Sequence, residues 1–177
     1  MRDAFERFGL LINDRIVKPP VGIASMAGIV DVPYVLARAG HIGFAFIGGY
    51  AIDVPTMAAA KSLAAGGDRK EFLYKDPVQE LRAQIARMEK SEVVFGINLR
   101  GRSPESFRAL AKALGDSVVY EIDAHCRQPA MVAAGCGEYY LNHPDGLVAA
   151  VRALKEEGVT VSVKIRVGIA KDDRALA

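Results

Sequence analysis

Short apolar runs alternate with longer amphipathic stretches along this chain, a pattern typical of βα units on a parallel sheet. The apolar runs are rich in Val, Ile and Phe and too short for helices, which indicates strands buried on both faces. The pattern predicts five strands, at Gly22–Ala27, Phe44–Ile47, Val93–Leu99, Val118–Asp123 and Thr160–Val167. The second strand is expected to be short and to end at Gly48-Gly49.

Helices are predicted between the strands, and most of them carry a proline in the first turn. Proline is favoured there because the N–H group that it lacks would have no partner inside the helix. An Asp or Ser before the proline accepts hydrogen bonds from the remaining free N–H groups. The predicted helices begin near Asp31, cover Val54–Ala65, follow Asp76-Pro77, run from Ser103-Pro104 to Gly115, and run from His143-Pro144 to Gly158.

The strand–helix order permits two parallel architectures, an open doubly wound sheet and a (β/α) barrel. No Gly-x-Gly-x-x-Gly motif follows a predicted strand, so the dinucleotide-binding form of the open sheet is disfavoured. We therefore expect an α/β fold of the (β/α) TIM-barrel type, with about five of the eight βα units present. No repeat or linker divides the chain, and residues 1–177 are expected to form one partial barrel domain.

Composition adds mild limits. The chain has 177 residues, is 51% hydrophobic and 25% charged, and carries a net charge of +2, as expected of an ordinary globular domain. No apolar run approaches the roughly 20 residues of a membrane span, and the N-terminal residues mix both signs of charge. The two cysteines have no partner at metal-ligand spacing, which favours a reducing compartment. We expect a cytoplasmic protein without a metal site, a membrane partner or the basic surface of a dedicated nucleic-acid binder.

Candidate chemistry follows the fourth predicted strand. Asp123, His125 and Cys126 come where the strand gives way to its loop, at the edge of the sheet where α/β enzymes place their active sites. The thiol of Cys126 either faces a ligand there or is a small buried apolar group. His125 is expected to lie behind the site or to face solvent, because neighbours in an extended segment point apart.

The segment from Glu121 to Gly137 resembles the signature of the tRNA-dihydrouridine synthase family. In that family a strand ending in Asp-Ile-Asn is followed by a catalytic cysteine and then by Gly-x-Gly, and the spacing is the same here. The resemblance places Asp123 at the substrate-binding amide, Cys126 at the catalytic cysteine, and Gly135 with Gly137 at the glycine pair. It implies that Cys126 gives a proton to one carbon of a uracil double bond while reduced FMN gives a hydride to the other.

Two earlier segments resemble flavin-contacting motifs of the same family. Ser25, Met26 and Ala27 lie in a segment similar to Ala-Pro-Met-Ala-Gly at the end of the first strand, and Asn98 takes the place of a Gln at the end of the third. The resemblance implies cofactor binding by all four residues. Without it, the first segment could be a tight turn after a strand, and Asn98 could be a structural amide that joins two strands.

The last predicted strand contains two basic residues on one face. Val163 to Gly168 resembles the family's Val-Lys-Ile-Arg-x-Gly, in which the lysine contacts the flavin. Lys164 is accordingly expected to bind the cofactor, since an ammonium in an apolar strand is costly unless it is paired or faces a ligand. Arg166 is expected either to bind an anionic substrate or to form an ordinary ion pair.

The chain departs from the family pattern in several places. Asp123 replaces an amide, Ser25 replaces a proline, and Ala130 replaces a lysine four residues after the catalytic cysteine. The chain also ends soon after the fifth strand, whereas a complete barrel takes about 250 residues. We expect the C-terminal barrel strands and the family's helical RNA-binding domain to be absent. The chain is then either a piece of a longer protein or a subunit whose open sheet edges are covered in an oligomer.

Three functions remain open at this stage. The first is an FMN-dependent oxidoreductase that reduces the C5–C6 double bond of a uracil-like ring in tRNA, with NAD(P)H as electron donor. The second is a flavin-barrel dehydrogenase that acts on a free, small pyrimidine-like molecule, as dihydroorotate and dihydropyrimidine dehydrogenases do. The third is a barrel remnant without catalysis.

Overall fold

The computed structural model describes residues 10–12, 14–67, 70–169 and 174. Its main sheet contains five parallel strands, which confirms the predicted α/β class and the predicted number of sheet strands. The order in the sheet is β3 (Gly22–Ile23), β4 (Phe44–Ala51), β5 (Val94–Arg100), β6 (Val119–Ala124) and β7 (Val161–Ile165). Within the described residues, β3 and β7 are the edges of this sheet.

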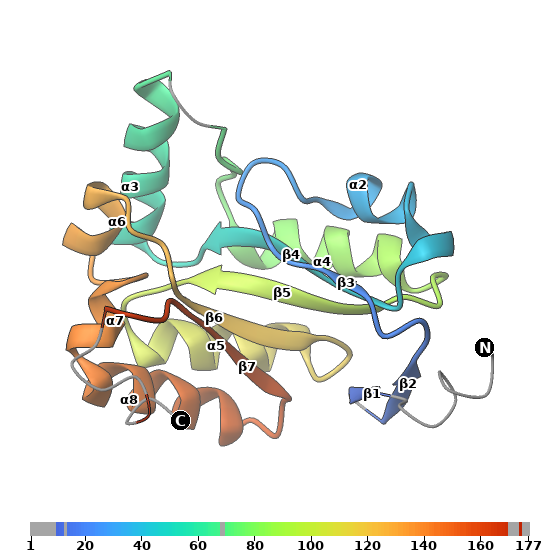
Figure 1. Ribbon diagram of the computed structural model, residues 1–177. Coiled ribbons are helices and arrows are strands. Elements are labelled where there is room, and N and C mark those ends of the chain that lie inside the picture. Colours follow the sequence, from blue (N-terminus) through green and yellow to red (C-terminus); the bar gives the residue numbers. More distant parts are fainter. Residues whose placement is uncertain (1–9, 13, 68–69, 170–173, 175–177) are drawn as a thin grey trace.

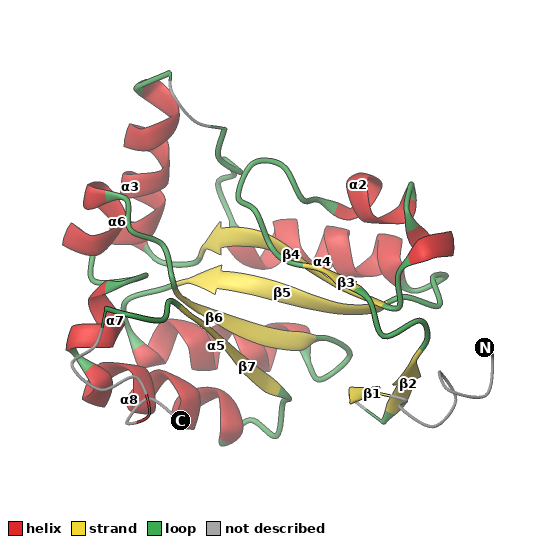
Figure 2. Cartoon of the chain, in the orientation of Figure 1, coloured by secondary structure: helices red, strands yellow, loops and turns green. Residues whose placement is uncertain are grey.

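The strand order equals the chain order, and this places the covering helices on one face. Each right-handed crossover steps to the next strand in the same direction and leaves its helix on the same side of the sheet. A doubly wound sheet would instead reverse its order and carry helices on both faces. The sheet is therefore a curled half-barrel whose outer face is covered by helices, as Figure 1 and Figure 2 show.

The five predicted helices are present as α2 (Val32–Leu36), α3 (Val54–Ala65), α4 (Pro77–Met88), α5 (Pro104–Leu114) and α8 (Pro144–Lys155). Asp31, Asp76 and Ser103 each accept hydrogen bonds from first-turn N–H groups, as the sequence predicted. The last helix ends at Lys155, three residues before the predicted Gly158. Elements that the sequence did not predict are β1 (Leu10–Ile12), β2 (Arg15–Val17), η1 (Ala39–His41), α6 (Pro129–Ala133) and α7 (Tyr139–Asn142).

Several strand boundaries differ from the prediction. The expectation that β4 ends at Gly48-Gly49 was wrong, because Gly48 pairs with Asn98 and the strand continues after a shift in register. Conversely, β3 ends at Ile23, so residues 24–27 form a loop across the end of the sheet. The last strand is also shorter than predicted and ends at Ile165. As a result β4 is longer than predicted, and residues 24–27 are available to line the site.

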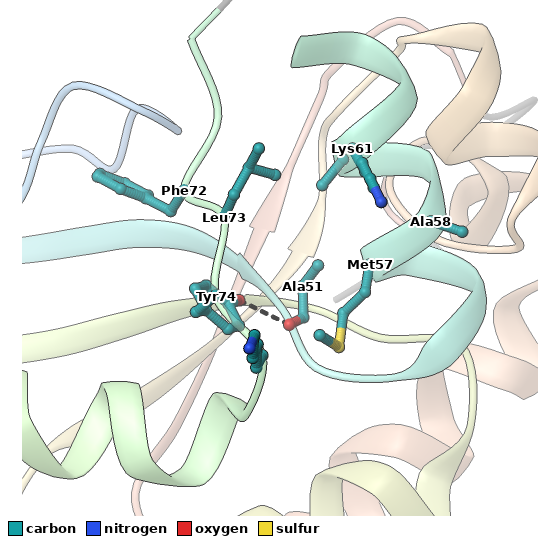
Figure 3. A pocket seen from close by; sticks show the side chains of 9 residues that line it. Ala51, Met57, Ala58, Lys61, Phe72, Leu73 and Tyr74 are labelled. Atoms are coloured by element: carbon teal, nitrogen blue, oxygen red, sulfur yellow. Dashed lines mark hydrogen bonds between the residues drawn. The ribbon is translucent and has the colours of Figure 1, made fainter. Parts of the chain in front are cut away.

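A segment between α3 and α4 crosses the end of β4. The Tyr74 hydroxyl in this segment donates a hydrogen bond of 2.6 Å to the carbonyl of Ala51, the last residue of β4 (Figure 3). The ring of Phe72 stacks on Tyr50 with centroids 5.0 Å apart. The segment is thereby fixed against the carboxyl end of the sheet, and it carries Glu71 into that region.

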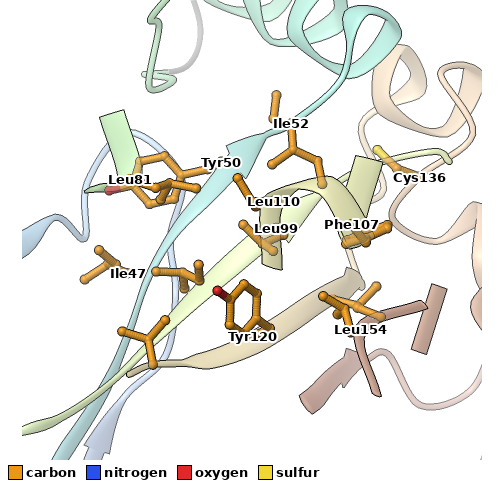
Figure 4. Close-up of a cluster of buried hydrophobic side chains, with 14 of the residues drawn as sticks. Ile47, Tyr50, Ile52, Leu81, Leu99, Phe107, Leu110, Tyr120, Cys136 and Leu154 are labelled. Carbon is orange, nitrogen blue, oxygen red and sulfur yellow. The ribbon is translucent and has the colours of Figure 1, made fainter. Parts of the chain in front are cut away.

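The hydrophobic core lies between the outer face of the sheet and the helices. Alternate strand residues point to opposite faces, so Ile47, Leu99 and Tyr120 pack against helix residues such as Leu81 and Leu154 (Figure 4). The strand residues that alternate with these core residues point to the concave face of the sheet. No helix among the described residues is long and apolar enough to cross a membrane.

Candidate functional site

A pocket of about 590 Å³ lies at the carboxyl end of the parallel strands. Every residue that the sequence analysis proposed for catalysis, cofactor binding or substrate binding lines it. These residues are Ser25, Met26, Ala27, Asn98, Asp123, Cys126, Lys164 and Arg166. The structure thus brings together, at one edge of the sheet, side chains that are up to 141 residues apart, counted from 25 to 166.

The register of the strands explains why these side chains meet. Asn98 lies opposite Glu121 on the next strand, and Asp123 lies opposite Lys164. Paired residues in adjacent strands point to the same face, and residues two apart in one strand do so as well. Asn98, Glu121, Asp123 and Lys164 therefore form a polar patch on the concave face, while the apolar residues between them enter the core.

Glu121 is the centre of one hydrogen-bond network in this patch. Its Oε1 accepts hydrogen bonds from Asn98 Nδ2 at 2.8 Å and from Ser25 Oγ at 3.2 Å. Lys164 Nζ in turn donates to the Ser25 carbonyl at 2.9 Å and to Ser25 Oγ at 3.1 Å. One buried carboxyl group thus links the three polar residues that the sequence analysis assigned to the cofactor.

Burial sets the protonation of this carboxyl group. Desolvation raises the pKa of Glu121, and the nearby Asp123 adds to the rise, whereas Asn98, Lys164 and Ser25 act to lower it. The network also orients the amide of Asn98, whose Nδ2 donates to Glu121. A methyl group added at Gly49 would lie 2.8 Å from Asn98 Oδ1, so this oxygen faces the Gly49 backbone.

Arg100 is the centre of a second, ionic network. Its Nη1 lies 2.7 Å from a Glu71 oxygen and its Nε lies 3.2 Å from an Asp123 oxygen. The three side chains are at most 7% exposed. Burial acts to lower the pKa of Arg100, but Cys126, Glu71 and Asp123 outweigh it and the pKa is raised. Arg100 therefore stays charged and holds the two carboxylates in place.

Asp123 shapes the loop that carries the thiol. Its Oδ1 accepts hydrogen bonds from the backbone N–H groups of His125 and Cys126, both at 2.9 Å. Such a turn is a common use of aspartate after a strand. Both oxygens of Asp123 therefore have protein donors, one from the backbone and one from Arg100. Its contact with a substrate stays a prediction.

Cys126 lines the pocket and is 5% exposed. Its thiol donates a hydrogen bond to the side-chain carbonyl of Gln128. The glycine pair of the sequence motif has a structural reason, because Gly137 has φ of +67° and a Cβ there would lie 2.2 Å from the Cys126 carbonyl. The Glu138 N–H donates to that same carbonyl at 2.8 Å. Gly137 thus permits the close packing that holds the cysteine loop.

Basic side chains gather at one side of the pocket. Arg166 Nε lies 3.4 Å from the His125 carbonyl, and Arg127 and Lys164 also line the pocket. Burial lowers the pKa of His125, and the positive charges of Arg166 and Lys164 lower it further. The imidazole is therefore neutral at pH 7. It is half-buried and lines the pocket, so it lies closer to the site than the sequence analysis expected.

Three residues of the two buried networks were not predicted from the sequence, namely Glu121, Arg100 and Glu71. Glu121 and Arg100 each lie two positions from a predicted site residue on the same strand, so the period of two could have identified them. Glu71 comes from a segment between two helices, and no local pattern marks it. Among the described residues, no three His, Cys, Asp or Glu side chains are placed to bind a metal ion together.

The sequence matches no model of a protein family. Among curated proteins it is similar to "Uncharacterized protein MJ0144" of Methanocaldococcus jannaschii, with 27% identity over 151 residues. The matched region covers 82% of this chain and 57% of the archaeal protein. The chain thus spans little more than half the length of that relative, whose name gives no activity.

Proposed function

We propose that this chain forms part of an FMN-dependent reductase barrel of the dihydrouridine synthase type, in which Cys126 is the proton donor. The proposal rests mainly on one observation: the thiol of Cys126 and the ammonium of Lys164 line the same pocket at the carboxyl end of neighbouring strands. In complete barrels of this class, active sites are built from the loops at that end. The reaction proposed is reduction of the C5–C6 double bond of a uracil-like ring.

The residues present fit the ring part of a flavin. The pocket volume of about 590 Å³ lies in the range of small-molecule and cofactor sites. Lys164 supplies a cation that would stabilise an anionic reduced ring, and Asn98 Oδ1 supplies a fixed acceptor. Bound FMN would supply the hydride and would be reduced again by NAD(P)H. By resemblance, the phosphate group belongs to strands that follow β7 in a complete barrel.

The protein's own part is to hold and deliver a proton. Gln128 accepts a hydrogen bond from the Cys126 thiol, which orients the S–H group. The turn at Asp123 fixes the position of Cys126 at the pocket wall. When the proton leaves for a ring carbon, the thiolate is stabilised by Arg100, with which Cys126 interacts electrostatically. The thiol is therefore suited to serve as a general acid.

Replacement of Cys126 by Ala tests this role. We expect flavin binding to persist and turnover to fall by about 10² to 10⁴, the usual contribution of a positioned acid. Cys136→Ala is the matched control, since Cys136 is the other buried cysteine outside a disulfide and does not line the pocket. The assay follows loss of uridine from unmodified tRNA or of free uracil by mass spectrometry, with flavin and NAD(P)H supplied. Equal turnover in wild type and Cys126→Ala would remove the thiol from the mechanism.

Lys164→Ala tests the cofactor assignment. We expect weaker retention of FMN, measured as flavin absorbance after gel filtration, because the only strand lysine in the pocket lining is lost. Lys155→Ala is the control, since this lysine lies at the end of α8 and donates to the Val159 carbonyl. Full retention of FMN by Lys164→Ala would make the lysine structural. Failure of the wild-type protein to bind FMN would favour the barrel remnant without catalysis.

A free pyrimidine-like substrate is the second candidate. The observation that favours it is the distribution of charge: basic residues gather at the pocket, while the whole chain carries a net charge of only +2. A tRNA substrate requires affinity that falls steeply with salt, because bound phosphates release counterions. Retention on tRNA with such a salt dependence would support tRNA processing in the cytoplasm. Turnover of free uracil without retention on tRNA would support the small-molecule enzyme.

A further inference from the structure

A second pocket, of about 410 Å³, lies beside the end of β4, between α3 and the segment that follows it. It shares no lining residue with the pocket that contains Cys126. We propose that this second pocket binds an amphipathic anion, meaning a small ligand with an apolar body and one carboxylate or similar acidic group. The site is independent of the function proposed above.

The walls of this pocket are apolar and partly open to solvent. Met57 projects from α3, and Phe72, Leu73 and Tyr74 come from the segment opposite (Figure 3). Leu73 is 57% exposed, although burial of a leucine side chain is favourable. An apolar ligand body would remove this surface from water, which gives the site a driving force for binding.

The aromatic wall is held in place by contacts within the chain. Phe72 stacks on the buried Tyr50, and Tyr74 lies against the same ring with centroids 6.0 Å apart. The Tyr74 hydroxyl is fixed to the Ala51 carbonyl. A preformed wall spares a ligand the entropy cost of ordering it. The pocket therefore has the apolar, largely preformed character of small-molecule sites.

The charges at this pocket are of one sign. Lys61 and Lys75 are the charged residues among the described residues that line it, and no Asp or Glu is among them. Lys61 lies one helical turn after Met57, so its ammonium stands beside the apolar wall on the same face of α3. Long basic side chains can cover apolar surface with their stems and place the charge at the rim. An anion attached to an apolar body satisfies both features at once.

A small molecule fits this pocket better than a folded partner. The volume of about 410 Å³ lies within the range of small-ligand sites. A stable protein–protein interface buries at least about 1,000 Å², which needs a broad surface rather than a pocket of this size. The test must still detect the alternative that a second copy of the chain covers this pocket.

Titration with decanoate, followed by nuclear magnetic resonance of labelled protein, tests the proposal. We expect saturable shifts of the signals of Ala51, Met57 and Phe72, and weaker binding of decanol, which has the same chain without the charge. Inorganic phosphate alone should not shift these signals, because it lacks the apolar body. Absence of saturable decanoate binding would overturn the proposal. So would shifts of these signals with protein concentration alone, which would indicate self-association.

Two variants show where the ligand binds. The double variant Lys61→Gln, Lys75→Gln removes two exposed ammonium groups that would pair with the carboxylate of decanoate. Each exposed ion pair changes the affinity by a factor of about 1.4 to 5, so the double variant should bind decanoate about 2- to 25-fold more weakly. Its affinity for decanol should not change. Arg152→Gln is the control, because this exposed arginine lies on α8 away from the pocket lining. Equal loss in the control would refute the assignment.

The second variant fills the pocket instead of changing its charge. Ala58 is exposed and lines the pocket, so Ala58→Trp adds a large ring there while the helix keeps its buried face. We expect this variant to stop binding decanoate and decanol alike, with an unchanged circular dichroism spectrum. Undiminished binding by a folded Ala58→Trp variant would place the ligand elsewhere and overturn the proposal.

Discussion

The buried ion pairs of Arg100 allow a quantitative test of the site's construction. Replacement of Arg100 by Met keeps an unbranched side chain of similar length but leaves Glu71 and Asp123 without their shared countercharge. The two arginine pairs have N–O distances of 2.7 and 3.2 Å, and side-chain exposure is 1% for Glu71 and 7% for Asp123. Removal of one partner from such a buried pair costs about 3–5 kcal/mol. This is a large part of the roughly 5–15 kcal/mol by which a domain is stable.

The measurement is urea unfolding at pH 7, followed by circular dichroism. We expect Arg100→Met to lose about 3–5 kcal/mol of unfolding free energy, because two buried carboxylates lose the guanidinium that pairs with both.

Arg108→Met is the matched control for the loss of an arginine. Arg108 pairs with Glu156 and Glu157 on the surface, and its side chain is 35% exposed. Exposed pairs of this kind contribute little to stability. The unfolding midpoint of Arg108→Met should therefore stay close to that of the wild type. If Arg100→Met loses no more stability than this control, the buried network does not hold the loop as argued.

Three further predictions concern single residues near the thiol. Gly137→Ala should lower the free energy of unfolding in urea by more than about 1 kcal/mol, because the backbone is left-handed and the new Cβ would lie 2.2 Å from the Cys126 carbonyl oxygen. Gly158→Ala is the control and should lower it by less, because Gly158 has φ of +76° but no atom within 4 Å of the added Cβ. Burial raises the pKa of Glu121 in the folded protein above the pKa of a glutamate in the unfolded chain, so the wild type loses stability as the pH rises from the lower to the higher of these two values. Glu121→Gln cannot ionise, and its stability in urea unfolding should therefore increase relative to wild type over the same pH range. Burial lowers the pKa of His125, and the positive charge of Arg166 lowers it further. Arg166→Gln should therefore raise this pKa, measured by titration of the imidazole signals in nuclear magnetic resonance; an unchanged pKa would show that the Arg166 charge does not act on His125.

The sequence predicted the sheet well because its signals are local. Apolar runs marked each strand, and Asp31, Asp76 and Ser103 cap their helices as predicted. The parallel order of the strands followed from the alternation with helices. The convergence of Asn98 and Lys164 also followed, since the carboxyl ends of parallel strands meet at one edge.

What the sequence could not show depends on contacts between distant segments. Glu71 pairs with Arg100 because the segment that carries Glu71 is fixed to the end of β4, in part by the hydrogen bond of the Tyr74 hydroxyl. Gly48 reads as a strand end in isolation, but pairing with Asn98 keeps it inside the sheet. Glycine is disfavoured in strands by local propensity, and here tertiary pairing overrides that preference.

The ionic network also accounts for the aspartate that departs from the resembling motif. A carboxylate at position 123, where that motif has a neutral amide, would place an uncompensated charge beside the thiol. Arg100 supplies the compensation from the neighbouring strand, two residues after Asn98, and Glu71 forms a second ion pair with the same guanidinium. Asp123 Oδ1 accepts two backbone hydrogen bonds and its other oxygen pairs with Arg100, so this carboxylate serves the cysteine loop and the buried ion pair at once. The ion pair with Arg100 thus allows a carboxylate at position 123 to hold the cysteine loop without leaving an unpaired charge in the buried site.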